Sequence, residues 1–187
     1  MLSIIQRFFI IGIFMSFALT SHAQDATIDS LKRAFTNPKL HDSTKLRALS
    51  TIMGSQYTLE DPNYYYLNGM MEKMALKNFK SNAAHPDQQK LYADYLGEVY
   101  ASSAIGAQRK RDYRSAFIAI NKSIVFYKRS KSYELMNFSI VTKGTLYSDI
   151  QDYEKALECF FQSLRYFEQA KEENSASGVS YVQTYLG

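Results

Sequence analysis

The segment from Tyr153 to Phe167 reads YEKALECFFQSLRYF, and its pattern decides the fold class. Large apolar residues recur at intervals of three and four, which is the spacing of one buried face on an α-helix. Charged and polar residues occupy most positions between them, so the opposite face is expected to meet water. Each large side chain of the stripe contributes roughly 1.5–3 kcal/mol if it is fully buried. The stripe consists of Tyr153, Ala156, Leu157, Phe160, Phe161, Leu164 and Phe167.

Two short marks recur along the chain and indicate an internal repeat. The first is Tyr-x-x-Ala followed four residues later by a large apolar residue, at Tyr113 and again 40 residues on at Tyr153. The second is a glycine followed three residues later by a tyrosine. It occurs at Gly54, Gly97 and Gly144, and Leu186-Gly187 begins a fourth copy, so that successive glycines are separated by 43, 47 and 43 residues. The positions that define the repeat are Gly54, Tyr57, Gly97, Tyr100, Ala116, Gly144, Tyr147, Ala156 and Phe160.

Together these marks resemble the tetratricopeptide (TPR) repeat, in which Leu-Gly-x-x-Tyr on one helix is followed by Ala-x-x-x-Phe on the next. Small residues at the glycine and alanine positions let two helices approach closely, and the large residues fill the space around them. The resemblance implies an all-α fold, an antiparallel helix-pair solenoid in a right-handed superhelix, with about three repeats and a partial fourth. The spacing exceeds the 34 residues of a standard repeat, so the chain resembles a long-helix variant.

Helix boundaries follow from capping residues and prolines. Asp61-Pro62 reads as an N-cap followed by proline in the first turn, and Pro86 opens another helix. Asn37-Pro38 closes a first one. The predicted helices span residues 27–36, 43–58, 62–79, 87–107, 111–130, 134–149, 152–172 and 177–187.

Residues 1–23 have the three regions of a secretory signal peptide. Arg7 supplies a positive charge, Phe8 to Leu19 is an almost unbroken apolar run, and Ser21 and Ala23 place small residues before a cut at Gln24. The run is shorter than the ~20 residues of a membrane span, although a retained anchor is the alternative. We therefore expect an exported protein of the periplasm or cell envelope, with no membrane span in residues 24–187. The predicted organisation is a signal peptide at 1–23, an N-terminal helix and linker at 24–42, and the repeat array at 43–187.

Composition and motifs argue against catalysis. Of 187 residues, one is cysteine and three are histidine, and the net charge is only +4. The sequence has no zinc motif, phosphate-binding glycine loop or nucleophile elbow. Cys159 lies on an apolar helical face and is read as a core residue. The basic cluster at Arg109, Lys110 and Arg111 is read as a solvated turn between helices. We expect no enzyme activity, catalytic residue, metal site or cofactor, and no nucleic-acid partner.

The TPR resemblance implies that the first helix of each pair lines a concave, partner-binding face. That lining is small, polar and mildly acidic, which suits a peptide or protein partner, possibly a basic one. The predicted partner-binding residues are Thr51, Ser55, Asp94, Glu98, Val141, Thr145 and Ser148.

Two functions are compatible with this sequence. The first is an exported, non-catalytic interaction scaffold. The second is the extracytoplasmic sensor region of a signalling receptor, with a histidine kinase or helix-turn-helix output beyond Gly187. The second reading is motivated by the apolar residues near Gly187, which would lack a capping helix.

Overall fold

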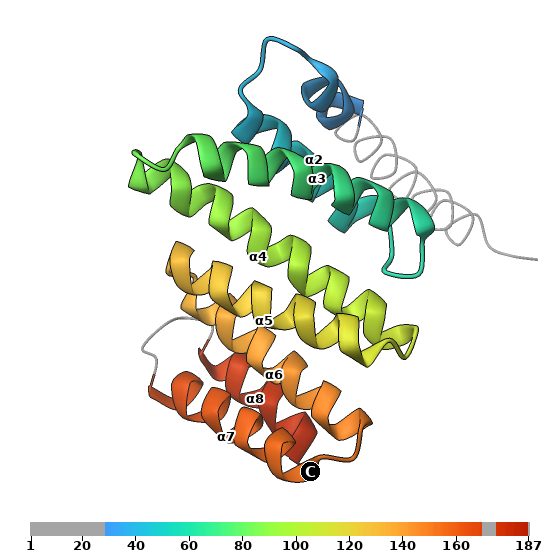
Figure 1. Cartoon of the computed structure of the whole chain (residues 1–187), viewed down its shortest axis with the longest axis vertical. Coiled ribbons are helices and arrows are strands. Elements are labelled where there is room, and N and C mark those ends of the chain that lie inside the picture. The colour runs from blue at the N-terminus through green and yellow to red at the C-terminus, as the bar shows by residue number, and fades with distance from the viewer. Residues whose placement is uncertain (1–28, 170–174, 187) are drawn as a thin grey trace, which may run out of the picture. The chain divides into compact units, whose positions relative to one another are not determined.

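A computed structural model describes residues 29–169 and 175–186, and all of its regular secondary structure is helical (Figure 1). The predicted signal peptide lies outside the described residues. Residues 29–36 are helical. The later helices are α2 (Asp42–Gln56), α3 (Pro62–Ser81), α4 (Pro86–Arg109), α5 (Tyr113–Ser130), α6 (Tyr133–Asp149), α7 (Tyr153–Gln169) and α8 (Ser175–Leu186).

The all-α prediction is thereby confirmed for the described part of the chain. The ends of α2 to α8 lie within three residues of the predicted bounds. None of these helices, within the residues described, is long and apolar enough to cross a membrane. The chain forms two compact units, residues 1–56 and residues 57–187.

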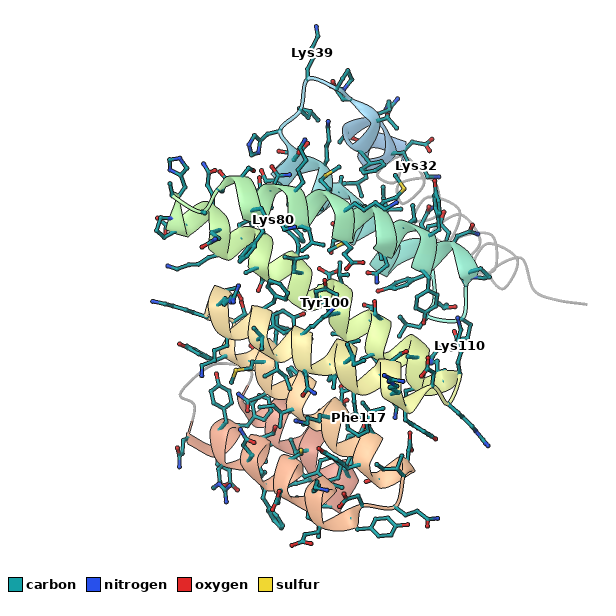
Figure 2. The ribbon with its side chains drawn as sticks, viewed as in Figure 1. Lys32, Lys39, Lys80, Tyr100, Lys110 and Phe117 are labelled. Carbon is teal, nitrogen blue, oxygen red and sulfur yellow. The ribbon has the colours of Figure 1, made fainter. Side chains whose placement is uncertain are left out.

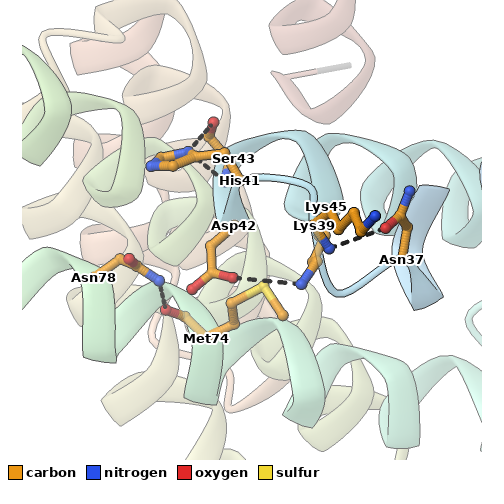
Figure 3. Close-up of polar contacts among 8 residues, drawn as sticks. All are labelled: Asn37, Lys39, His41, Asp42, Ser43, Lys45, Met74 and Asn78. Carbon is orange, nitrogen blue, oxygen red and sulfur yellow. Dashed lines mark hydrogen bonds and ion pairs between the residues drawn. The ribbon is translucent and has the colours of Figure 1, made fainter.

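In the first unit, polar contacts organise the approach to α2 (Figure 3). The backbone N–H of Lys39 donates to Asn37 Oδ1 at 2.9 Å. His41 Nδ1 and Ser43 Oγ lie 2.8 Å apart, and Lys45 forms an ion pair with Asp42 at 3.9 Å. These contacts satisfy polar groups where the helix begins, a place where backbone N–H groups lack intrahelical partners.

In the second unit, each helix packs on the next one along the chain (Figure 1). Near the end of α4, Ala104 packs with Ala116 at the start of α5, whereas Gly97 in the middle of α4 meets Tyr127 near the end of α5. Adjacent helices in this pair therefore run antiparallel. Tyr100 and Phe117, labelled in Figure 2, show how aromatic rings fill the spaces between helices. Tyr100 donates to Glu72 of α3 at 2.8 Å, and the Phe117 ring packs 4.8 Å from that of Tyr147 of α6.

Alternate helices also touch. The backbone of α4 contacts that of α6, and α6 contacts α8. Among the described residues, α5 makes no such backbone contact with α3 or α7. The helices α4, α6 and α8 therefore form one layer that is more closely spaced than the layer of α3, α5 and α7.

The turns before α5 and α7 have the same geometry, 40 residues apart. Arg111 and Gln151 both adopt left-handed conformations, with φ of 58° and 63°. The next residue in each turn is an aspartate, and it caps the helix that follows. Asp112 accepts from the N–H of Ser115 at 3.1 Å, and Asp152 accepts from the N–H of Lys155 at 3.4 Å. A left-handed residue also precedes α6, at Lys131 with φ of 65°, but Ser132 after it makes no side-chain cap, so the aspartate cap is the feature that recurs at the 40-residue spacing.

The repeat glycines permit close helix contacts at two of the three described positions. A Cβ at Gly97 would lie 2.5 Å from the Tyr127 ring, and one at Gly144 would lie 2.5 Å from the Phe160 ring. A Cβ at Gly54 would meet no described atom within 4 Å, so this glycine does not serve that purpose. Two further close contacts, Gly106 with Tyr65 and Gly178 with Phe167, were not predicted from the sequence.

Candidate partner-binding groove

A groove of about 290 Å³ opens on the layer formed by α4, α6 and α8. Small residues form part of its lining and leave the space open, while larger apolar residues form its walls. Two of the wall residues are well exposed: Leu135 is 41% exposed and Tyr181 is 38% exposed. The groove is therefore accessible from solvent. Its lining consists of Ala101, Ile105, Tyr127, Leu135, Phe138, Ser139, Thr142 and Tyr181.

A connected set of aromatic rings holds the α8 side of the groove. The Phe138 ring packs edge-on against that of Tyr181, with centroids 5.3 Å apart and planes at 67°. Tyr181 packs against Tyr185, and Tyr185 stacks on Phe160 of α7 at 5.4 Å. Phe138 also contacts Phe167 at 5.1 Å. Edge-to-face and offset ring contacts of this kind contribute stabilisation in addition to that of the buried area. They therefore hold α8 in position against α6 and α7.

Polar contacts fix α4 and α6 at both ends of the groove. At one end, Asp94 of α4 accepts hydrogen bonds from the hydroxyls of Ser130 and Ser132 in the turn before α6. At the other end, Gln108 of α4 donates to Thr145 at 3.2 Å and to Asp149 at 2.8 Å. The two helices therefore run parallel, with the groove between these pairs of contacts.

Two carboxylates of α4 influence the groove electrostatically, although its lining as described carries no charged side chain. Burial raises the pKa of the Tyr127 hydroxyl, and the nearby carboxylates of Glu98 and Asp94 raise it further. Burial and the neighbouring Tyr185 hydroxyl raise the pKa of Tyr181 to about 12. Both hydroxyls are therefore neutral at physiological pH, and the lining described by the structure includes no lysine or arginine.

The predicted partner-binding residues fall into three groups. Thr51 and Ser55 are exposed on α2 in the first unit, where their hydroxyls donate to backbone carbonyls of the same helix. Asp94, Glu98 and Thr145 are partly exposed. The spacing of Asp94, Glu98, Ala101 and Ile105 places all four on one stripe of α4, the stripe that borders the groove.

Val141 is a correction to the sequence prediction. Its side chain is 0% exposed and belongs to a core cluster with Phe160 and Val182. The helix α8 covers this position, so Val141 cannot present its side chain to a partner. Ser148 is partly exposed on α6 but does not line the groove.

Sequence reasoning missed the apolar groove residues Ala101, Ile105, Leu135, Phe138 and Tyr181. The sequence offered one indication of them: Ala101 and Ile105 continue the Asp94 and Glu98 stripe at helical spacing. Their apolar character fits a core position equally well, and their exposure depends on the distance between α4 and α6.

Other reactive or charged groups have structural roles. Burial is the main cause that raises the pKa of the Cys159 thiol, which favours its protonated form. In the predicted basic turn, Arg109 pairs with Glu60, and the Lys110 ammonium lies 5.6 Å from the centre of the Tyr65 ring. Among described residues, no three His, Cys, Asp or Glu side chains gather in a way that could hold a metal ion.

No protein-family model matches the chain, and comparisons with curated proteins and with solved structures found no match. The assignment of a function therefore depends on the chain's own sequence and geometry.

Proposed function

We propose that this protein is an exported, non-catalytic scaffold of the tetratricopeptide type that binds a peptide or protein partner. The binding surface is the face of α4, α6 and α8. In this proposal the helix pairs α4–α5 and α6–α7 are successive repeats of a right-handed solenoid, and α8 belongs to the next repeat. Export is proposed from the pattern of residues 1–23.

The groove on this face is the observation that carries the proposal. It is open and largely apolar, and its lining comes from α4, α5, α6 and α8, with α4 and α6 tied together by Gln108 at one end and Asp94 at the other. A concave site with mostly apolar walls and a few polar groups suits recognition of another molecule. The closer spacing of the α4–α6–α8 layer supports a curvature that makes this face concave.

The equivalent turns support the repeat assignment. Arg111 and Gln151 both have a positive φ, and the aspartates that follow them, Asp112 and Asp152, cap α5 and α7 in the same way. Arrays of such helix pairs commonly present extended concave binding surfaces.

Site-specific photo-crosslinking tests the binding face directly. A photoreactive amino acid replaces Leu135 in the groove or, as the control, Ile118 on α5, which is similarly exposed and lies away from the groove. Both full-length variants are expressed and irradiated in the native cell. We expect an adduct with another polypeptide from position 135 and little from position 118. Equal adducts at both positions, or an adduct from position 118 alone, would contradict the proposed face.

A further inference from the structure

We propose that the exposed face of α7 binds the same face of a second copy of the chain, with the two α7 helices antiparallel. This face belongs to the layer of α3, α5 and α7. The inference is therefore independent of the groove on α4, α6 and α8 and of the function proposed for it.

Two apolar side chains of α7 are left uncovered. Leu157 and Phe161 are 44% and 46% exposed and lie one helical turn apart. The sequence pattern assigned both to the buried stripe of this helix. Among the described helices, however, α7 contacts only α6 and α8, and neither residue belongs to the core cluster around Phe160. One copy of the described chain therefore does not bury the apolar surface that these two residues share.

The internal repeat does not require an apolar residue at position 161. Forty residues earlier, Phe117 corresponds to Leu157, and its ring packs on that of Tyr147 in the next helix. The residue that corresponds to Phe161 is Asn121, which is polar and exposed. An aromatic ring in this position adds to an exposed apolar patch, and such patches commonly mark sites of interaction.

Charged side chains surround these apolar residues in a definite order along the helix. An open hollow of about 520 Å³ follows this face of α7. Two carboxylates, Glu154 and Glu158, lie toward the start of the helix, and the guanidinium of Arg165 lies toward its end. None of the three takes part in the ion pairs formed among the described residues. The lining consists of Glu154, Leu157, Glu158, Phe161, Gln162 and Arg165.

This order of charges selects a second copy as the occupant. Glu154 and Glu158 are one turn apart and repel each other, so a positive charge beside them is favourable. The charge of Glu154 acts on the neighbouring Lys155, but that ammonium is already paired with Asp152. An antiparallel α7 brings its own Arg165 to the two carboxylates and presents its own carboxylates to the first Arg165. A two-fold axis that joins one patch to itself is the commonest arrangement in homo-oligomers.

The spacing of these residues fits a two-fold axis. At 3.6 residues per turn, Phe161 and the three charged residues fall within ~60° of one another around α7. Arg165 lies about nine residues, or ~13 Å, from the midpoint of the two glutamates. The centre of this span is next to Phe161. Pairing the charges of two antiparallel helices therefore brings the two Phe161 rings together at the axis, with Leu157 on either side of them.

The interface is small. Stable protein interfaces involve roughly 20–30 residues from each partner, whereas six residues line this hollow. The dimer is therefore weak and reversible, and it forms where the local concentration of the protein is high.

Sedimentation of the full chain over a wide range of concentration tests the inference. We expect a monomer that becomes a dimer as the concentration rises, and salt should weaken the dimer because it screens the attraction. Phe161→Lys should weaken self-association by about tenfold or more, because it places two like charges together at the axis. Val125→Lys on α5 is the matched control, since Val125 is 48% exposed and lies outside the hollow. Circular dichroism confirms that each variant is folded.

A mixing experiment tests the pairing of charges. Arg165→Glu leaves only negative charge on the face, and the double variant Glu154→Lys with Glu158→Lys leaves only positive charge. Each protein alone should remain monomeric, whereas an equal mixture of the two should form a dimer. A loss of folding in either variant cannot produce this result. Arg114→Glu on α5, which also changes an exposed arginine, should dimerise like the parent.

A photoreactive amino acid at position 161 identifies the occupant in the native cell. An adduct between two copies of the chain supports the inference. An adduct with a different polypeptide alone assigns the face to that partner and overturns it. A parent chain that stays monomeric at every concentration, a dimer that survives Phe161→Lys, or a mixture that fails to associate would each overturn it as well. None of these results bears on crosslinking from Leu135, which tests the proposed function separately.

Discussion

The ring of Phe160 occupies the space beside Gly144 where any other residue would place its side chain. A Cβ at Gly144 would lie 2.5 Å from one ring carbon of Phe160 and 3.1 Å from the Cβ of Cys159. Phe160 is itself buried, so its ring has little room to move. The packing of α6 on α7 therefore depends on the absence of a side chain at position 144.

Gly144→Ala should destabilise the protein. Overpacking typically costs about 1–3 kcal/mol, which outweighs the gain of about 0.8–1.0 kcal/mol from the better helix propensity of alanine. Gly69→Ala in α3 is the control, because a Cβ there meets no described atom within 4 Å. That variant should be as stable as the parent or more stable. Urea unfolding measures both, and the reverse order of stability would show that the α6–α7 contact is wrongly described.

Phe160→Ala should lower the free energy of unfolding by about 3–5 kcal/mol, through lost burial and the cavity left behind. The ring contacts Gly144 and stacks on Tyr185, so its loss affects both α6 and α8. Phe161→Ala is the matched control, since the neighbouring ring is 46% exposed. Chemical denaturation of the two variants should give clearly different midpoints, and similar midpoints would refute the assigned helix face.

Ala156→Leu should also lower the free energy of unfolding, by about 1–3 kcal/mol, because the larger side chain overpacks the core. Ala156 is buried in the cluster with Val141 and Phe160, so a longer side chain would have to displace these neighbours. Ala176→Leu on the exposed surface of α8 provides the comparison. A melting temperature for Ala156→Leu as high as that of the control would mean that the cluster has room and that the packing is looser than described.

Stability should fall as the pH rises from about 10 to about 12. Burial, followed by the hydrogen bond to Glu72 and its charge, raises the pKa of Tyr100 from 10.0 to about 12. In this window the unfolded chain loses the phenolic proton while the folded protein keeps it, so the unfolded state is favoured. The slope is at most about 1.4 kcal/mol per pH unit for each such tyrosine.

Replacing Tyr100 with phenylalanine should reduce the loss of stability per pH unit in this alkaline range. Denaturation at a series of pH values measures this slope. Tyr66→Phe should leave the slope unchanged, because the Tyr66 side chain is 69% exposed. Equal slopes in the parent and in Tyr100→Phe would show that the Tyr100 hydroxyl titrates alike in both states.

Export predicts a definite N-terminus. The protein recovered from the cell envelope should begin at Gln24, as determined by N-terminal sequencing. Ala23→Arg should block cleavage, because the position before the cut requires a small residue. Envelope protein that begins at Met1 would instead favour a retained anchor.

The sequence predicted the helices well because the responsible features are local. Apolar periodicity marks the buried face of α7, and Asp61-Pro62 marks the start of α3, where the aspartate accepts from the N–H of Asn63 at 2.8 Å. The close contacts at Gly97 and Gly144 also followed from the sequence, since the bulky partner lies on the next helix at a repeated offset.

The groove could not be predicted with the same accuracy, because its members are defined by neighbours distant along the chain. Val141 and Thr145 are one turn apart on α6, yet Val182 of α8 covers the first and leaves the second partly exposed. Asp94 was predicted as a partner contact from its place on α4. Its two serine hydrogen bonds show that it also holds the α5–α6 turn in place.

In the part of the second unit that the structure describes, the backbone contacts between helices join neighbours or next neighbours along the chain. Short-range contacts of this kind reduce the loop-closure entropy that must be overcome before contacts form, and they are associated with fast folding. They also mean that, among the described helices, those at one end of this unit make no backbone contact with those at the other end. Under tension applied to its ends, we expect such a unit to extend by releasing helices one or two at a time rather than all at once.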